Sequence, residues 1–173
     1  MYNIESKPMA MIVCLASYNE GKIHGKWVDM TQDINEIWDQ INNIIKTAPN
    51  PRSEEWEILD YDSFYVSNKI LRSKSIEELQ EIAQIIIDNG IVGSLLLDEQ
   101  GGEITTTKRM LENYIGCYES WEDYAWEYVN NYLDIPKEPE YYINYEKWGR
   151  DLELSGEIYC IEEGFRKLHF FHG

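Results

Sequence analysis

Cysteines are scarce in this sequence, and long apolar runs are missing. The 173 residues include only Cys14, Cys117 and Cys160, which are far apart and form no CxxC pair. An odd, scattered set argues against a disulfide framework or a zinc site, so three small buried thiols are expected. Apolar runs such as Met9–Ala16 are too short to span a bilayer. The first residues include acidic Glu5 and lack a basic-then-apolar signal pattern, which favours a cytoplasmic protein.

Basic residues are also few. The chain has 15 Lys and Arg against 32 Asp and Glu, a formal net charge of −17. Such a chain is repelled by nucleic acid and by anionic membranes, so cations or basic protein surfaces are its natural partners. Acidity can also serve solubility alone. With 43% hydrophobic and 13% aromatic residues, the chain can bury a core and is not a disordered acidic tail.

The motifs of most enzyme and metal-binding classes are absent. The three histidines, His24, His169 and His172, lie neither in HExxH nor beside a cysteine at ligand spacing. His169 and His172 are three apart near an expected strand end, so surface or strand-edge histidines are expected there. No nucleophile elbow, P-loop or Rossmann fingerprint is present. Asp98–Glu103 lacks the alternating oxygen ligands of a calcium loop. The sequence therefore predicts no metal, no cofactor and no catalytic residue.

Residues 1–61 have the pattern of a β-β-α-β domain. Ala10–Tyr18 is apolar and partly β-branched, and the alternating segment Lys22–Asp29 follows a turn, which predicts a hairpin. Asp33 is placed to cap a helix whose isoleucines recur at helical spacing and which must end before Pro49. Trp56–Tyr61 predicts a third strand, giving a three-stranded antiparallel sheet with one helix.

Residues 62–103 are predicted to form a central helical domain. Ser75 and Glu78 have the spacing of a capping box, and Gly90 can end the same helix with a left-handed cap. Val92–Gly102 predicts a further short helix.

Residues 104–173 are predicted to form an α+β domain. Thr105–Thr107 can cap a helix over Lys108–Tyr114. Two more helices are expected over 120–133 and 143–153, followed by a hairpin over 156–171 with Gly164 at its turn. The overall prediction is an α+β protein of three small consecutive domains, 1–61, 62–103 and 104–173.

The most acidic part of the chain lies in the third region. Residues 112–163 hold 14 acids and three bases, a net charge of −11. An acidic interaction surface is therefore predicted there, made of Glu112, Glu119, Glu122, Asp123, Glu127, Asp134, Glu138, Glu140, Glu146, Asp151 and Glu153.

The segment SWEDYAWEYVNNYLD, residues 120–134, carries part of this charge. On a 3.6-residue wheel its aromatic and acidic residues separate onto two faces. The face expected to pack on the core holds Trp121, Tyr124, Ala125, Tyr128 and Tyr132. The opposite face holds the acids without the lysines that would form i,i+4 pairs. Trp126 falls on or near this polar face and is the exception.

Three functions fit an acidic surface of this kind. Paired carboxylates with tryptophans could serve a glycan-acting enzyme, but any acidic protein offers such pairs. An adaptor for some basic protein is a second possibility. The third is imitation of DNA: a compact chain of this length is about 40 Å across, so 17 net charges give about one per 2.4 Å, against one per about 1.7 Å of duplex DNA.

Four sequence blocks resemble the ArdA antirestriction family. They are IVCLASYNEGKIHGKWVDM (12–30), EEWEILDYDSF (54–64), ENYIGCYESWEDYA (112–125) and YYINYEKWGRDLELSGEIYCIE (141–162). The last is the most specific, with Tyr145-Glu146 followed by Arg150-Asp151-Leu152-Glu153-Leu154-Ser155-Gly156. The resemblance runs from about Ile12 to Phe171 and is weakest between Tyr65 and Thr107.

The resemblance implies a function and an architecture. ArdA proteins are carried by conjugative plasmids and transposons, and they are non-enzymatic DNA mimics that bind type I restriction–modification enzymes in place of DNA. Their fold is an elongated three-part α+β structure, and they associate as dimers. The implied partners are thus the DNA-binding groove of such an enzyme and a second copy of the chain, with no nucleic acid and no membrane.

Overall fold

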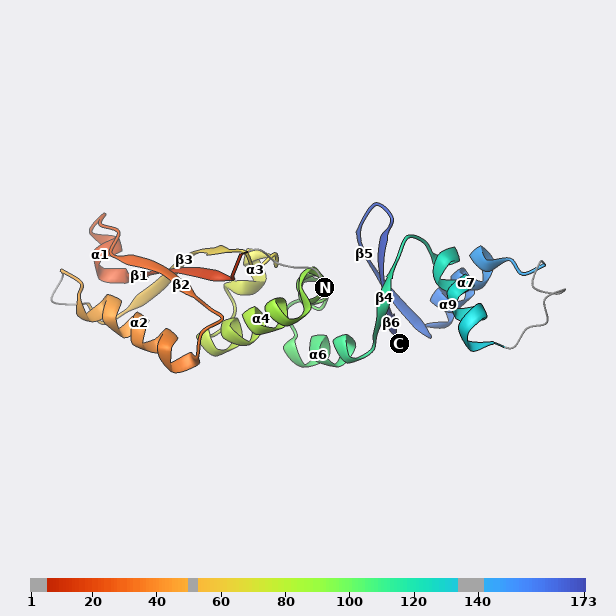
Figure 1. Cartoon of the computed structure of the whole chain (residues 1–173). Coiled ribbons are helices and arrows are strands. Elements are labelled where there is room, and N and C mark those ends of the chain that lie inside the picture. The colour runs from red at the N-terminus through yellow and green to blue at the C-terminus, as the bar shows by residue number, and fades with distance from the viewer. Residues whose placement is uncertain (1–5, 50–52, 134–141) are drawn as a thin grey trace. The chain divides into compact units, whose positions relative to one another are not determined.

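The computed structural model describes residues 6–49, 53–133 and 142–173. It divides into two compact units, Met1–Thr107 and Lys108–Gly173. Each contains a three-stranded antiparallel sheet with helices (Figure 1), which confirms the α+β class and the N-terminal three-stranded sheet. The finer division into three domains stays a prediction. No helix in the described residues combines the length and apolarity needed to cross a bilayer.

The sheet of the first unit has the order β2-β1-β3. The central strand β1 (Met9–Cys14) pairs antiparallel with β2 (Gly25–Asp29) and with β3 (Trp56–Asp62). The predicted hairpin is therefore confirmed, but its first strand is shorter than predicted, because the chain turns at Leu15 into the short helix α1 (Leu15–Asn19). Gly25 is required at the start of β2, since a Cβ there would overlap the carbonyl oxygen of Ile12.

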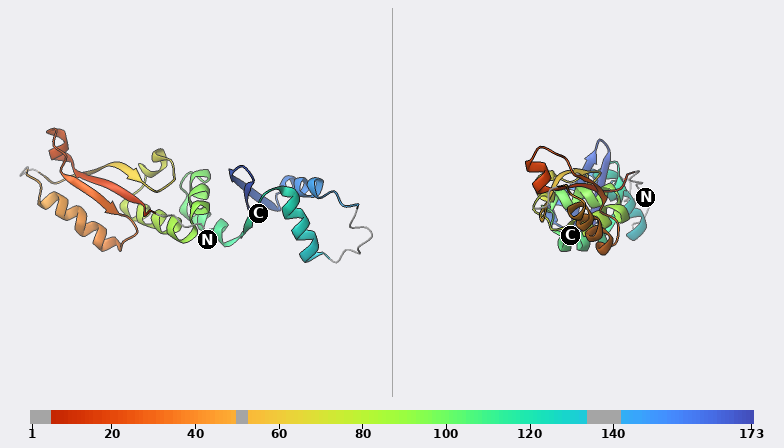
Figure 2. Two further views of the ribbon diagram at one scale, coloured as in Figure 1. Left: turned by 45° about the horizontal axis from the view of Figure 1, so that its top comes forward. Right: turned by 90° about the vertical axis from the view of Figure 1, so that its left-hand side faces the viewer.

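Helix α2 (Ile34–Lys46) covers one face of this sheet (Figure 2). Its buried side chains are Ile37, Ile41 and Ile44, the stripe that the isoleucine spacing predicts. The Asp33 carboxylate accepts a hydrogen bond from the amide of Asn35 and caps the helix as predicted.

Three further helices lie in the first unit: α3 (Asn68–Leu71), α4 (Ile76–Asn89) and α5 (Ile91–Glu99). The capping box of α4 is confirmed, because Ser75 Oγ accepts from the Glu78 amide while Glu78 Oε2 accepts from the Ser75 amide. Gly90 ends α4 with a φ of 64°, although its ψ of −146° lies outside the left-handed helical region. The same glycine begins α5, so two helices meet at one residue without a loop.

Helix α6 (Ile104–Glu112) spans the division between the two units. The prediction that threonines cap this helix was wrong, since the helix begins at Ile104 and all three threonines lie inside its first turns. Thr107 is buried, and its hydroxyl donates back to the carbonyl of Glu103. Threonine tolerates a helix interior when its hydroxyl finds such a partner one turn back.

The sheet of the second unit has the order β4-β6-β5. The hairpin of β5 (Ile158–Gly164) and β6 (Lys167–His172) is as predicted, except that Gly164 is the last paired residue and Arg166, at φ 59°, lies in the turn. Strand β4 (Tyr114–Tyr118), which was not predicted, pairs with the other side of β6. The last strand in the chain is thus the central strand of its sheet. Helices α7 (Trp121–Tyr132) and α9 (Tyr145–Ser155) pack against each other and against this sheet.

Candidate functional site

Helix α7 carries three of the predicted interaction residues, Glu122, Asp123 and Glu127. Ser120 caps it: Ser120 Oγ accepts from the Asp123 amide at 3.1 Å and donates to Asp123 Oδ2 at 2.7 Å. Glu122 and Asp123 therefore lie in the first turn, where the helix dipole stabilises negative charge. The positions of Glu122 and Asp123 therefore also stabilise the start of α7.

An aromatic contact fixes the inner face of α7 to the sheet. Tyr124 stacks on Phe170 with ring centroids 4.7 Å apart, and Trp121 meets the same phenylalanine edge-on at 4.7 Å. Ala125 and Val129 are buried beside them. This anchoring is the one that the helical wheel predicts, and it holds the opposite face of α7 toward solvent.

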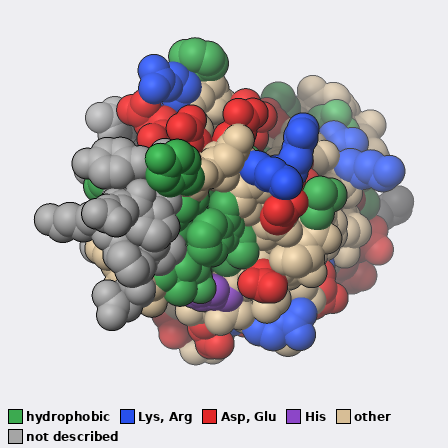
Figure 3. All heavy atoms as spheres, turned by 90° about the vertical axis from the view of Figure 1, so that its right-hand side faces the viewer, with side chains coloured by type: hydrophobic (Ala, Val, Ile, Leu, Met, Phe, Trp, Pro, Cys, Tyr) green, Lys and Arg blue, Asp and Glu red, His purple; other side chains and the backbone are tan. Residues whose placement is uncertain are grey.

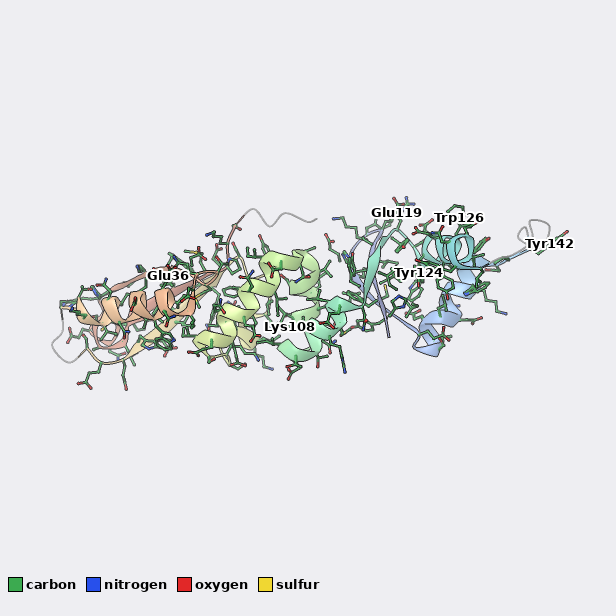
Figure 4. The ribbon with its side chains drawn as sticks, turned by 60° about the horizontal axis from the view of Figure 1, so that its bottom comes forward. Glu36, Lys108, Glu119, Tyr124, Trp126 and Tyr142 are labelled. Atoms are coloured by element: carbon green, nitrogen blue, oxygen red, sulfur yellow. The ribbon has the colours of Figure 1, made fainter. Side chains whose placement is uncertain are left out.

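Two aromatic residues of α7 remain exposed. Trp126 is 54% exposed and lies on the outer side of the helix, away from Tyr124 (Figure 4), as the wheel predicts. Tyr132 is 75% exposed, so its predicted place in the core was wrong. It is the last residue of α7, and its ring packs on Tyr128 at 5.4 Å, one turn back.

The predicted acidic residues that the structure describes are all exposed. They are Glu112, Glu119, Glu122, Asp123, Glu127, Glu146, Asp151 and Glu153. Three others, Asp134, Glu138 and Glu140, lie outside the described residues. The eight come from the end of α6, the turn after β4, and helices α7 and α9.

Three of these eight carboxylates have a polar partner. Glu119 forms an ion pair with Arg166 at 2.5 Å, Asp123 accepts from Ser120, and Glu127 accepts from the Tyr118 hydroxyl at 3.2 Å. Within the described ranges, the other five form no ion pair or side-chain hydrogen bond: Glu112, Glu122, Glu146, Asp151 and Glu153. These five are open to an external cationic partner.

Helix α9 mixes charge signs. Asn144 caps it by accepting from the Lys147 amide at 2.8 Å. Lys147 and Arg150 lie among the three acids of this helix, and all are exposed. A hollow of about 400 Å³ lies between α9 and the start of α7, and its lining is Trp121, Asn144, Glu146, Lys147, Arg150 and Glu153. Unlike α7, α9 therefore carries two cations on its acidic surface.

A second hollow, of about 360 Å³, lies between α7, β4 and β6. Its lining is Ile115, Tyr118, Tyr124, Glu127, Tyr128, Tyr132 and His172. Burial and the neighbouring tyrosines raise the pKa of Tyr124 to about 12. The wheel had assigned the tyrosines of α7 to the core alone. Their recurrence at 124, 128 and 132 is the sequence signal that marks this wall.

His169 is buried, so the prediction of a surface or strand-edge histidine was wrong for it. It lies in β6, which has a neighbour on both sides. Its Nδ1 is 2.9 Å from the Tyr114 hydroxyl and its Nε2 is 3.0 Å from Glu163 Oε2. Burial opposes ionisation of Glu163, but hydrogen bonds from Lys167 and His169 hold its pKa below the ordinary value. His172, three residues on, is exposed.

The cysteines differ from one another. Cys14 is buried, but Cys117 is exposed and Cys160 half-buried, so the prediction of three buried thiols was wrong for two of them. None of the three forms a disulfide within the described residues. Burial, with acidic neighbours, raises the pKa of Cys160 to about 12. Within the ranges that the structure describes, no three His, Cys, Asp or Glu side chains come together as metal ligands.

Residues 10–167 match the family model described as antirestriction protein (ArdA). The chain belongs to the ArdA family. The match covers most of both compact units, including α7, α9 and the acids that they carry. A search of curated proteins gave no match.

The ArdA assignment makes this an antirestriction protein, and the exposed acids described above lie within the matched residues.

The alternative that the protein is an enzyme predicts a cleft with an acid of raised pKa. Where carboxyl pKa values shift in the described residues, they shift down, because hydrogen bonds to the carboxylate outweigh burial. These groups are Asp29, Glu77, Glu78 and Glu163.

Proposed function

We propose that this ArdA protein is a non-enzymatic DNA mimic that inhibits type I restriction–modification enzymes. Its carboxylates take the place of DNA phosphates and bind the Lys- and Arg-lined groove in which the enzyme holds DNA. With the groove occupied, the enzyme cannot reach its substrate. The protein needs no cofactor for this and binds neither nucleic acid nor membrane.

The observation that carries this proposal is the set of exposed carboxylates without partners in a chain of the antirestriction family. Five such groups lie on the second unit, from Glu112 to Glu153. On α7, Glu122, Asp123 and Glu127 lie together with no Lys or Arg in the same helix, and like charges placed in this way destabilise a folded protein. Their place on a helix anchored by aromatic packing supports a role in which the charges are presented to a partner.

Counterion release explains how such a surface binds. DNA-binding grooves attract phosphates mainly through charge, and the resulting affinity falls steeply as salt rises. A protein that replaces DNA should show the same salt dependence. Because the charge is spread over many groups, each carboxylate should contribute little alone.

We further propose that the protein acts as a homodimer in the cytoplasm. A dimer would carry a formal charge of −34, twice the −17 of one chain. That longer array would imitate a longer stretch of duplex.

Competition for a purified type I restriction–modification enzyme tests this function. Fluorescently labelled DNA is bound to the enzyme, the protein is added, and anisotropy reports displacement over a range of salt concentrations. Displacement at low salt that weakens as salt rises is expected. Polyglutamate at the same total charge is the control and should displace DNA much less well. No displacement at low salt would contradict the proposal and would favour an adaptor for another basic protein.

A further inference from the structure

The hollow between α7, β4 and β6 has an unusual lining for so acidic a unit. Four of its seven lining residues are tyrosines, at 118, 124, 128 and 132. We call it the tyrosine pocket. The rings form a continuous row, with centroids 5.2 Å apart from Tyr118 to Tyr124, 6.2 Å from Tyr124 to Tyr128 and 5.4 Å from Tyr128 to Tyr132. Figure 3 shows a patch of hydrophobic side chains beside a histidine, with acids at its edge.

Core packing does not account for the outer part of this row. Tyr124 is buried against the sheet, but Tyr128 is only half-buried and Tyr132 is 75% exposed. Solvent-exposed tyrosine at the end of a helix leaves apolar ring surface in water. The outer two rings extend the wall of the pocket beyond the core.

The electrostatics of the tyrosine pocket favour a cation. Aromatic rings present a negative face, and cations bind over it within about 6 Å of the ring centre. The Glu127 carboxylate adds a full negative charge to the wall, where Tyr118 donates to it. No Lys or Arg is among the lining residues that the structure describes. By contrast, the hollow on α9 has Lys147 and Arg150 in its lining.

We propose that the tyrosine pocket receives one arginine side chain of a protein partner. A guanidinium group is flat and weakly hydrated, so it stacks on tyrosine rings, and its five N–H donors can bond carboxylate and hydroxyl oxygens together. Lysine offers a strongly hydrated point charge that stacks less well. That the partner is a restriction–modification enzyme rests on the proposed function; that the pocket takes a guanidinium does not.

Binding of a small arginine compound tests the pocket by itself. The full-length protein, with ¹³C-labelled tyrosine rings, is titrated with N-acetyl-arginine amide and followed by NMR. Saturable shifts of the Tyr128 and Tyr132 ring signals are expected. N-acetyl-citrulline amide has nearly the same shape without the charge and should give none. Equal responses to both compounds, or an equally strong response to N-acetyl-lysine amide, would overturn the proposal.

Substitutions at the exposed end of the tyrosine row test the pocket without disturbing the fold. Tyr132→Ala removes a ring that is 75% exposed and should weaken arginine-amide binding about fivefold. Tyr132→Phe keeps the ring and should bind nearly as the unchanged protein does. Tyr142→Ala is the matched control, because Tyr142 is 90% exposed and does not line the pocket. Equal binding by all three variants would also overturn the proposal.

The competition assay then separates the two ideas. If the unchanged protein displaces DNA and Tyr132→Ala needs about five times more protein to do so, both the mimicry and the arginine contact are supported. Equal displacement of DNA by Tyr132→Ala and by the unchanged protein, at the same protein concentration, would contradict the arginine contact and leave mimicry intact. Failure of the unchanged protein to displace DNA would defeat mimicry, while the arginine-amide titration would still decide the pocket.

Discussion

The Tyr124 ring lies flat against the Phe170 ring, with centroids 4.7 Å apart and planes inclined by 17°. This pair joins α7, which carries acids on its outer face, to β6, the central strand of the sheet in the second unit. The display of charge therefore depends on an apolar contact beneath it.

Phe170→Ala should destabilise the second unit by about 3 kcal/mol, because it empties a fully buried ring site that three other aromatic rings contact. Urea unfolding followed by tryptophan fluorescence measures the loss. Phe165→Ala is the control, since that phenylalanine is 90% exposed and its removal should change stability by less than about 0.5 kcal/mol. Equal effects of the two changes would mean that the Phe170 contacts do not anchor α7.

Neutralising one carboxylate should reduce displacement of DNA only slightly. Glu122→Gln, Glu146→Gln and Asp151→Asn each remove one exposed charge without breaking a described contact, and each should weaken displacement about twofold. The triple variant should weaken it further and lower its salt dependence. Glu122→Asp, which keeps the charge, is the control. Loss of nearly all activity from one of the single changes, with the fold intact, would count strongly against mimicry.

Removing cations from α9 should have the opposite effect. Lys147→Gln together with Arg150→Gln takes two positive charges from the acidic surface, so DNA displacement should improve about twofold to fourfold. Lys46→Gln with Lys69→Gln makes the same change in net charge on the first unit. A similar gain from that control pair would show that total charge matters more than its position.

Glu163 should make folding sensitive to acid. Its folded-state pKa is lowered below the ordinary value of 4.5, so its contribution to stability is present above that pH and is lost as pH falls through the lower folded value. Urea unfolding at pH 7, 4.5 and 3.5 should show a smaller acid-induced loss for Glu163→Gln than for the unchanged protein. Glu162→Gln, at an exposed neighbouring position, should retain the full loss. Parallel pH profiles for all three proteins would rule out this role.

Local signals in the sequence located most of the elements. The capping box at Ser75 and Glu78, the isoleucine stripe of α2 and the Ser120 cap of α7 each depend on residues a few positions apart, and the structure confirms them. Strand β4 was missed because Tyr114–Tyr118 is short and has no turn that pairs it with a neighbour along the chain. Its partner β6 is some 50 residues later, and no local pattern specifies such a pairing.

The features of the candidate site that depend on one helix alone could also be predicted from the sequence. A helical wheel separates the acids of α7 from Tyr124, because both sets belong to one helix. The wheel could not give the exposure of Tyr132, which depends on where α7 ends, or the burial of His169, which depends on which strand is central in the sheet. The tyrosine pocket joins three elements, so only its α7 wall has a signal in the sequence.

The central place of β6 also sets an order for synthesis. The ribosome makes β4, α7, α9 and β5 before the strand that lies between β4 and β5. Until Phe170 emerges, Tyr124 and Trp121 lack the buried ring that both of them contact, so this part of the aromatic face of α7 is uncovered in the nascent chain. The first unit contains all three strands of its own sheet and can fold while this happens. A chain that stalls after Gly164 would therefore present to chaperones and proteases a finished first unit followed by an unclosed, aromatic-rich second one.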